Sequence, residues 1–327
     1  IITMSSHHWL LAWLGLELNT LSILPIIMKT HHPRSTEATT KYFLMQATAA
    51  ALILFASTIN AYQTGQWSIT LCSSPSAATI LTIAIMLKLG LAPTHFWYPE
   101  VLQGSTIRTA LIISTWQKIA PLTLLYLMTN SLPTNTLMLI GLISALAGGW
   151  LGLNQTQTRK IMAFSSIAHM GWLIVALSLN PNLATLTLVM YLMMTTTMFM
   201  SLDTTSTKTL LDLGATWSYS PALTATTMIT LMSLGGLPPL TGFMPKWLIL
   251  KELTLNQLAL TGTLLALASL PSLVFYIRMT YLTALTTPPN TTNTEHKWRF
   301  KNKTRLIPTI MLSIFLLPMT PMLYNTT

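Results

Sequence analysis

Apolar residues form long runs along almost the whole chain, and short polar stretches separate these runs. A helix that crosses a bilayer needs about 20 mostly apolar residues. The sequence therefore predicts ten spanning helices, at residues 9–28, 42–60, 76–98, 107–129, 134–153, 160–180, 183–203, 221–254, 257–284 and 305–325. Residues 1–4 are expected to be the end of a further, partial helix. Because the connections are short, we expect an all-α polytopic membrane protein in which residues 1–327 form a single transmembrane domain.

Glycine and proline interrupt two of the predicted spans. The third span contains LKLGLAPTHFWYPE and the eighth contains SLGGLPPLTGFMPKW. Proline removes a helical hydrogen bond, and broken backbone at membrane depth is tolerated only where protein or water covers it. The interruptions are five helices apart, an odd number, so the two segments cross in opposite directions. We therefore predict an inverted five-helix repeat with halves at about 1–130 and 134–285, followed by a C-terminal helix at about 305–325.

The composition supports a membrane protein and argues against other classes. Of the 327 residues, 51% are hydrophobic and 7% are charged, whereas soluble domains carry about 25% charged residues. The net charge of +10 would suit nucleic acid, but the basic residues lie within spans and short connections. The one cysteine, Cys72, argues against an internal disulfide or a cysteine-ligated cluster. No Walker loop, GxGxxG, CxxC or HExxH motif occurs, so we expect no metal or redox cofactor on this chain.

Lysine and arginine are distributed unevenly between the two ends of the predicted helices. When the connections are assigned alternately to two sides, the 17 basic residues divide into thirteen on one side, one on the other and three within spans. The thirteen are Lys29, Arg34, Lys41, Arg108, Arg159, Lys160, Lys208, Arg278, Lys297, Arg299, Lys301, Lys303 and Arg305. The positive-inside rule places them on the cytoplasmic or matrix side, and the C-terminus on the other. The Lys297–Arg305 connection could hold anionic phospholipid such as cardiolipin.

Four ionisable side chains lie within otherwise apolar spans, namely Glu17, Lys88, Lys118 and Lys246. One such group at the centre of a membrane helix costs roughly 2.5–3.5 kcal/mol, so four cost about 10–14 kcal/mol without compensation. A chain that keeps these groups pairs them, hydrates them or uses them. The pattern indicates an ion or proton pathway.

Each of the four also has a structural interpretation. Glu17 can pair with Lys88 at one end of a channel, or the two can form a fixed salt bridge that sets helix packing. Lys88 can load and release a proton, or extend to the membrane interface. Lys118 can cap the carbonyls that Pro121 frees, and Lys246 can cap the second interruption. The sequence leaves these alternatives open.

Two histidines are candidate proton relays. His169 lies a third of the way into its span, in SSIAHMGWLIV, and His95 lies inside the first interruption. Imidazole titrates near neutral pH and can pass protons between groups of different affinity. The alternatives are a core histidine with satisfied hydrogen bonds for His169, and a helix cap for His95.

Six strings, spread from Ser5 to about Tyr281, carry a family resemblance. They are SSHHWLLAWLGLELN, KYFLMQATAA, LKLGLAPTHFWYPEVLQG, TWQKIAPL, GLNQTQTRKIMAFSSIAHMGW and LSLGGLPPLTGFMPKW. In order and spacing they resemble the chain 2 family of mitochondrial NADH–ubiquinone oxidoreductase, a core membrane subunit of respiratory complex I. That family is related to cation/proton antiporters. The resemblance implies an antiporter-like bundle with two discontinuous helices and a central axis of charged residues.

The resemblance also implies roles for individual side chains. Five of them are similar to the glutamate, the two middle lysines, the histidine and the distal lysine of the family's axis. They are Glu17, Lys88, Lys118, His169 and Lys246. Thr94 departs from the family motif, which usually reads Pro-Phe-His, and adds a hydroxyl beside His95.

Membership of this family implies that redox energy released elsewhere in the complex drives proton translocation across the mitochondrial inner membrane. NADH, FMN, iron–sulfur clusters and ubiquinone would all bind elsewhere in the complex. The partners would be the other core and accessory subunits of the membrane arm. The basic loops would face the matrix and the C-terminus the intermembrane space.

Two other functions share parts of this pattern. A stand-alone cation/proton antiporter would also have buried lysines and broken helices, but would be expected to carry further carboxylates within its spans. A purely structural subunit would use its buried charges to dock neighbouring subunits. In that case neutralising Lys118 would harm assembly and not turnover.

Overall fold

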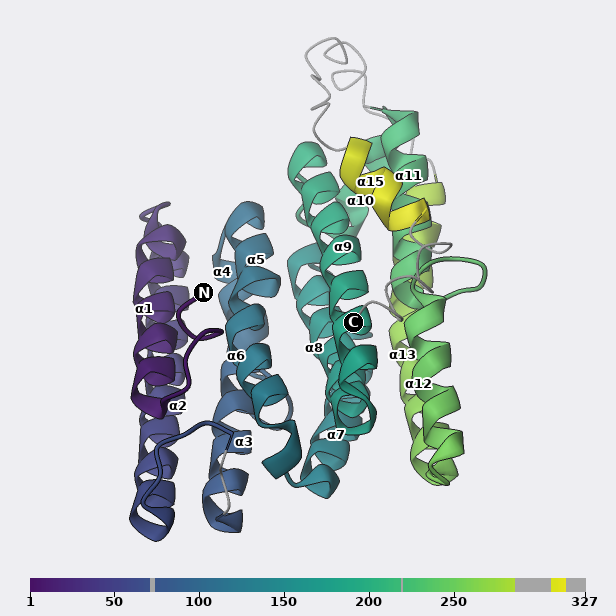
Figure 1. Cartoon of the computed structure of the whole chain (residues 1–327). Helices are drawn as coiled ribbons and strands as arrows, with labels where there is room; N and C mark the ends of the chain where they lie inside the picture. Colours follow the sequence, from purple (N-terminus) through teal and green to yellow (C-terminus); the bar gives the residue numbers. More distant parts are fainter. Residues whose placement is uncertain (71–73, 219, 286–306, 316–327) are drawn as a thin grey trace.

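The computed structural model describes residues 1–70, 74–218, 220–285 and 307–315, and the regular structure within these ranges is helical. The helices are α1 (Trp9–Met28), α2 (Pro33–Thr64), α3 (Pro75–Leu89), α4 (Trp97–Gly104), α5 (Ile107–Ser114), α6 (Trp116–Leu127), α7 (Thr134–Gly152), α8 (Thr158–Leu179), α9 (Pro181–Thr205), α10 (Leu210–Ala215), α11 (Pro221–Gly235), α12 (Phe243–Leu255), α13 (Ala259–Ala284) and α15 (Ile307–Phe315). The long helices run side by side, with α1 and α2 at one end of the bundle and α12 and α13 at the other (Figure 1).

Much of this layout agrees with the sequence prediction. Among the described residues, seven helical segments are long and apolar enough to cross a membrane, which confirms an all-helical membrane protein. Helix α2 begins at Pro33, well before the predicted residue 42, because His32 caps its first turn and Pro33 suits the first helical position. Only α15 is described from the predicted last span, and the Lys297–Arg305 connection lies outside the described residues.

The predicted span at 107–129 is divided in two, which the sequence did not indicate. Helix α5 ends at Ser114 and α6 begins at Trp116, with Thr115 between them at φ −114° and ψ −70°. The short helix α10 was not predicted either. It packs against α13, and a capping box between Thr209 and Asp212 starts it.

The two predicted interruptions are real breaks and share one hydrogen-bond pattern. Helices α3 and α11 each have 15 residues and each end at a glycine in the left-handed region, Gly90 at φ +73° and Gly236 at φ +78°. At both ends the glycine N–H and the following N–H donate back into the last turn, which is the Schellman motif. Each break then continues through a cis X–Pro peptide into α4 or α12.

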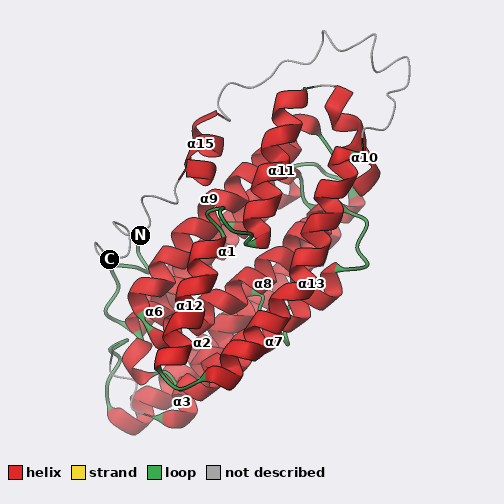
Figure 2. Cartoon of the chain, turned by 90° about the vertical axis from the view of Figure 1, so that its right-hand side faces the viewer, coloured by secondary structure: helices red, strands yellow, loops and turns green. Residues whose placement is uncertain are grey.

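Helix α8 forms the centre of the bundle. Of its most apolar 18-residue window 89% is buried, against 33% for α1 and for α13. Helix α7 packs closely on it because small residues face the contact: a Cβ added to Gly148 would lie 2.6 Å from the backbone nitrogen of Ala168. Figure 2 shows α15 on the outside of the bundle, where it contacts α9 and α11.

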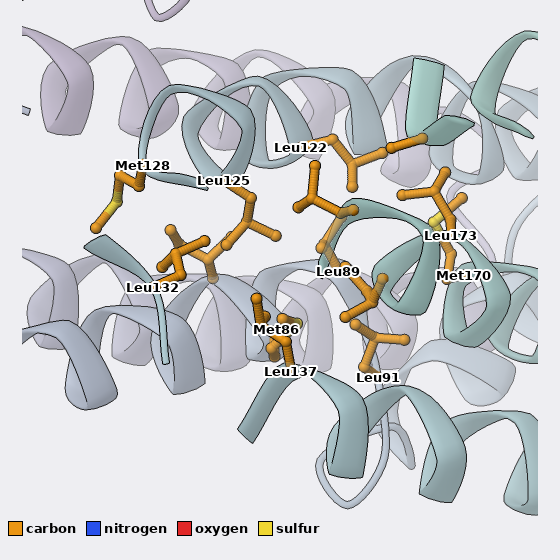
Figure 3. Packing of buried hydrophobic residues seen from close by; sticks show 14 of the residues in the cluster. Met86, Leu89, Leu91, Leu122, Leu125, Met128, Leu132, Leu137, Met170 and Leu173 are labelled. Atoms are coloured by element: carbon orange, nitrogen blue, oxygen red, sulfur yellow. The ribbon is translucent and has the colours of Figure 1, made fainter. Parts of the chain in front are cut away.

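An apolar cluster fills the space between α3, α6, α7 and α8. Figure 3 shows Leu89 and Leu91 from the first break facing Leu122 of α6 and Leu173 of α8. All four are buried. This packing holds the end of α3, which carries Lys88, against the central helices.

Candidate functional site

Ionisable side chains from five helices form a buried row through this bundle. Lys88 in the last turn of α3 and Lys118 in α6 are buried, with 6% and 3% of their surface exposed. Glu17 in α1, His169 in α8 and Lys246 in α12 are partly buried. The structure thus brings the five predicted residues into the interior, although each lies on a different helix.

Glu17 and Lys88 do not form the predicted ion pair. No Glu17–Lys88 contact is among the ion pairs of the described residues, and neither the Lys88 Nζ nor the Glu17 Oε2 has a hydrogen-bond partner there. Helices α1 and α3 both pack on α2, and Leu16 and Asn19 of α1 line the same small cavity as Lys88, so the two side chains lie on neighbouring helices without forming an ion pair. The two interpretations that depend on contact, a channel-end pair and a fixed salt bridge, are therefore wrong for this conformation. Because Lys88 is buried, its extension to the interface is wrong as well.

A small polar cavity lies between Lys88 and Lys118. Its volume is about 10 Å³, which is at the lower limit for one ordered water molecule. Gln46 of α2 also lines it and donates to the Lys88 carbonyl at 3.2 Å. On another side, the Asn19 amide donates to the Gln117 side chain at 2.5 Å. The cavity places both buried amines next to groups that can bind a shared water.

Lys118 is surrounded by tyrosine. Its Nζ donates to the Tyr191 hydroxyl at 3.2 Å, and it lies 4.9 Å from the ring centre of Tyr98 and 5.1 Å from that of Tyr191. Such cation–π contacts stabilise a buried ammonium. This is the one hydrogen bond of the Lys118 amine in the described structure, so capping of carbonyls freed by Pro121 is wrong.

His169 lies between Lys118 and Lys246 and contacts two tyrosines. Its Nε2 is 3.3 Å from the Tyr276 hydroxyl, and its ring centre is 5.9 Å from that of Tyr191. Tyr191 thus contacts both Lys118 and His169. The histidine has a hydrogen-bond partner, as a satisfied core histidine would, and its neighbours are also those that a relay needs.

Lys246 closes the row at the second break. Its Nζ donates to the carbonyl of Gly235, the last residue of α11, at 2.9 Å, and lies 6.0 Å from the Trp172 ring centre. The capping interpretation is therefore correct for the resting geometry of Lys246. His95 in the first break is different, because both of its ring nitrogens are buried without a partner and its ring stacks on Phe96. His95 does not cap a helix through a hydrogen bond.

Sequence reasoning missed the tyrosines that connect the row, Tyr98, Tyr191 and Tyr276. A signal was present, because Tyr191 in LVMYLMM and Tyr276 in LVFYIRM stand at mid-span, whereas membrane tyrosines usually lie at the interface. Both are buried. The hydroxyls of Tyr191 and Tyr276 supply polar contacts to the row, whereas Tyr98 contacts Lys118 through its ring.

A second polar cavity, of about 270 Å³, opens near the start of α2. Lys41 forms ion pairs there with Glu37 at 2.5 Å and with Glu100 of α4 at 2.6 Å. Arg34 and Lys160 complete the charged lining. Tyr42, the residue of α2 that follows Lys41, lines the small cavity beside Lys88, so the same helix lines both cavities.

No group of three or more His, Cys, Asp or Glu side chains is placed to hold a metal ion in the part of the chain that the structure describes. The ionisable groups of the row are mostly amines and tyrosines, which exchange protons more readily than they bind metal cations. The arrangement is suited to moving protons.

Comparison with known proteins gives the family. Residues 6–273 match the family described as NADH:quinone oxidoreductase/Mrp antiporter, TM, and residues 273–324 match NADH dehydrogenase subunit 2 C-terminus. NADH-ubiquinone oxidoreductase chain 2 of Gallus gallus is 54% identical over 98% of this chain and 94% of the relative. The Xenopus laevis protein of the same name is 52% identical over the same shares. This chain belongs to the NADH-ubiquinone oxidoreductase chain 2 family. The resemblance inferred from the six strings is confirmed.

Solved structures agree with membership of this family. A chain of respiratory complex I from Thermus thermophilus with bound aureothin has a TM-score of 0.80 and 26% identity, covering 97% of this chain and 76% of that one. A chain of the Mrp complex from Dietzia sp. has a TM-score of 0.79 at 14% identity, covering 87% of this chain and 58% of that one. The second likeness is one of fold, and it confirms the antiporter-like architecture.

Proposed function

We propose that this chain is a core membrane-arm subunit of respiratory complex I, the proton-translocating NADH:ubiquinone reductase. The observation that carries the proposal is the near full-length match to NADH-ubiquinone oxidoreductase chain 2 of Gallus gallus. NADH oxidation and ubiquinone reduction take place elsewhere in the complex, where NADH, FMN, iron–sulfur clusters and ubiquinone bind. This chain carries no redox centre and contributes proton translocation.

The proton pathway consists of Glu17, Lys88, Lys118, His169 and Lys246, with His95 as a side branch at the first break. Redox energy reaches this chain as an electrostatic or conformational pulse that changes the relation between Glu17 and Lys88. A proton then moves from Lys88 through Lys118 and His169 to Lys246. Moving one charge across the membrane costs about 2.3 kcal/mol per 100 mV, which equals a shift of under two pKa units at 1.36 kcal/mol each. Shifts of this size are common for buried amines.

The geometry supports this order. The cavity beside Lys88 also touches Lys118, Tyr191 contacts Lys118 and His169, and Tyr276 bonds to His169. Gly235, whose carbonyl holds Lys246, packs near Tyr276, with 3.8 Å between an added Cβ and the tyrosine. Tyr191 therefore bridges Lys118 and His169, and the small cavity gives a water a place between Lys88 and Lys118.

The chain is one transmembrane domain of ten full helices, arranged as an inverted five-helix repeat over about 1–130 and 134–285. Residues 1–4, which the sequence predicted to be the end of a further helix, form a single turn that the Ser5 N–H closes on the Ile1 carbonyl. The equal lengths of α3 and α11 and their shared Schellman ends support the repeat. The helix at about 305–325 follows the repeat. The protein lies in the mitochondrial inner membrane, with the basic loops in the matrix and the C-terminus in the intermembrane space.

The partners are the other core and accessory subunits of the membrane arm, together with phospholipid. Apolar side chains exposed along α1 and α13, such as Leu18 and Leu267, supply surface for these contacts. The Lys297–Arg305 connection binds anionic phospholipid such as cardiolipin. A lipid-resolved structure of the complex with no anionic lipid at this connection would contradict the proposed phospholipid site.

The first test uses solubilised native membranes. A native gel is stained for NADH dehydrogenase activity, and this chain is identified in the bands by mass spectrometry. We expect the chain only in a very large, NADH-oxidising band. Recovery of the chain as a small oligomer without that activity would overturn the assignment.

A stand-alone cation/proton antiporter is the second candidate, and the description of the family that matches residues 6–273, NADH:quinone oxidoreductase/Mrp antiporter, favours it. Glu17 is the one acidic residue in the middle of a described span, which argues against a separate cation site of carboxylates. If the chain migrates as a small oligomer, cation-driven proton flux in liposomes tests this candidate directly.

A purely structural subunit is the third candidate. Substitutions of Lys118, described in the Discussion, distinguish it from the proton-translocating subunit.

A further inference from the structure

At the break between α5 and α6, a side-chain hydroxyl replaces a backbone N–H as the donor to one carbonyl. In a continuous α-helix the Ser114 carbonyl would accept from the backbone N–H of Lys118, four residues later. Here the Lys118 N–H donates to the Thr115 carbonyl at 3.3 Å. The Ser114 carbonyl accepts instead from the hydroxyl of Tyr191 on α9, at 2.8 Å. A side chain has thus taken the place of a backbone donor.

The same hydroxyl also binds the side chain of Lys118. A phenol has one hydrogen to donate and lone pairs to accept. Because its hydrogen points to the Ser114 carbonyl, the Tyr191 oxygen accepts from the Lys118 Nζ, 3.2 Å away. The hydroxyl of Tyr191 therefore joins two groups. One is the side-chain amine of Lys118, and the other is the Ser114 carbonyl, which would accept from the Lys118 backbone N–H in a continuous helix.

We propose that Tyr191 is a positioning residue that couples the proton on Lys118 to the conformation of the α5–α6 break. An ammonium can only donate, so it keeps the Tyr191 hydrogen on Ser114 and the break open. A neutral amine has a lone pair that accepts this hydrogen. The Ser114 carbonyl is then free for the Lys118 N–H, and residues 107–127 close into a continuous helix. The inference rests on the proposed function, because it requires Lys118 to gain and lose a proton.

Other groups also face Lys118, but none makes this double contact. They are Lys88 of α3 across the cavity, Tyr98 of α4 and His169 of α8, while α1 contributes the uncharged Asn19 and Thr20 to the cavity, with Glu17 in the preceding turn. They influence the charge of Lys118 through space. In the described structure Tyr191 is the group that touches both the amine and the break.

The test compares Tyr191→Phe with Tyr126→Phe in the assembled complex. Tyr126 is a matched control because it lies on α6, is two-fifths exposed and has no part in the row. In a high-resolution structure of Tyr191→Phe we expect the Lys118 N–H to bond to the Ser114 carbonyl and α5 to continue into α6. An open break in that variant would overturn the proposal. If Tyr191→Phe does not assemble, structures of the unmodified complex at about pH 6 and about pH 10 replace it, with an open and a closed break expected.

A spectroscopic measurement separates positioning from packing. Infrared difference spectra of the complex with labelled tyrosine rings, recorded with and without NADH, should contain a tyrosine band that Tyr191→Phe removes and Tyr126→Phe keeps. A tyrosine that only packs would give no such band, and its absence would refute the coupling. Failure of the proposed function would be seen separately, as absence of the chain from the NADH-oxidising band.

Discussion

Lys246 donates a hydrogen bond to the carbonyl of Gly235 across the break between α11 and α12, at 2.9 Å. Gly235 is the last residue of α11, so its carbonyl has no partner within the helix. The amine thus closes the helix end while it remains next to the tyrosine and histidine of the row. A charged lysine here stabilises the break, and a proton that leaves Lys246 weakens that bond.

Replacing Lys246 by methionine should lower the rate of proton translocation by roughly 100-fold, the size typical for loss of a proton-transferring group. The matched control is Lys251→Met on the same helix, because Lys251 is exposed. Proton uptake and NADH oxidation are measured together in sealed membrane vesicles. Equal effects of the two substitutions would exclude a special role for Lys246.

Substitution of Lys118 separates proton transfer from assembly. Lys118→Met should leave the complex intact on native gels and lower proton translocation by roughly 100-fold. Lys118→Arg keeps a positive charge but does not release its proton, so it should have nearly the same functional effect. A structural role predicts the opposite pattern, in which Lys118→Met loses the complex and Lys118→Arg restores both assembly and turnover.

The two breaks at Gly90 and Gly236 and the buried charges could be predicted because single residues indicate each of them in the sequence. Gly90 and Gly236 adopt left-handed backbone that other residues avoid, and a lysine in an apolar run is visible at once. The break at Thr115 has no such signal, because no glycine or proline stands there and the cause is the hydroxyl of Tyr191, 76 positions later.

The pairing of Glu17 with Lys88 was wrong for a related reason. The sequence shows which residues are ionisable but not which helices are neighbours. Helices α1 and α3 both pack on α2 and both line the small cavity, and this arrangement depends on packing along the whole bundle. Contacts between helices, including the tyrosine bridges, therefore needed the structure.

Gly236 offers a test of the second break that is independent of charge. An alanine there would be forced into the left-handed region, at a cost of about 1–2 kcal/mol, and its Cβ would lie 2.9 Å from the Lys246 Nζ. Gly65→Ala is the matched control, since Gly65 has φ +72° and no atom within 4 Å of the added Cβ. Both variants should lower thermal stability similarly, but only Gly236→Ala should impair proton translocation. An equal functional loss would contradict the placement of Lys246.

The α7–α8 contact should be sensitive to one methyl group. In Gly148→Ala the added Cβ would lie 2.6 Å from the Ala168 nitrogen and 2.8 Å from the Phe164 carbonyl oxygen, so the helices must separate. We expect a loss of about 1–3 kcal/mol. In Gly262→Ala the nearest atoms are 3.8 Å away, and removing a helical glycine should stabilise by about 0.5–1 kcal/mol. Thermal dissociation of the solubilised complex measures both, and destabilisation by Gly262→Ala alone would contradict this packing.

Acid should loosen the start of α10, which lies outside the predicted spans. The Asp212 carboxylate accepts from the backbone N–H groups of Lys208 at 3.0 Å and Thr209 at 2.8 Å. Burial raises the pKa of Asp212, but these hydrogen bonds outweigh it, so the pKa is lower than the ordinary value of 3.8. A lowered pKa means that the cap is fully stabilising above the ordinary value and is lost as the pH falls through the folded value.

Amide hydrogen exchange near Thr209 measures this effect. We expect faster exchange as the pH falls below about 4, after correction for the intrinsic pH dependence of exchange. Asp212→Asn keeps the shape and a weaker acceptor but has no carboxyl group to titrate. Its exchange should be faster than that of the unmodified protein at neutral pH and should not change further on acidification. A pH response of equal size in Asp212→Asn would show that another group controls this helix end.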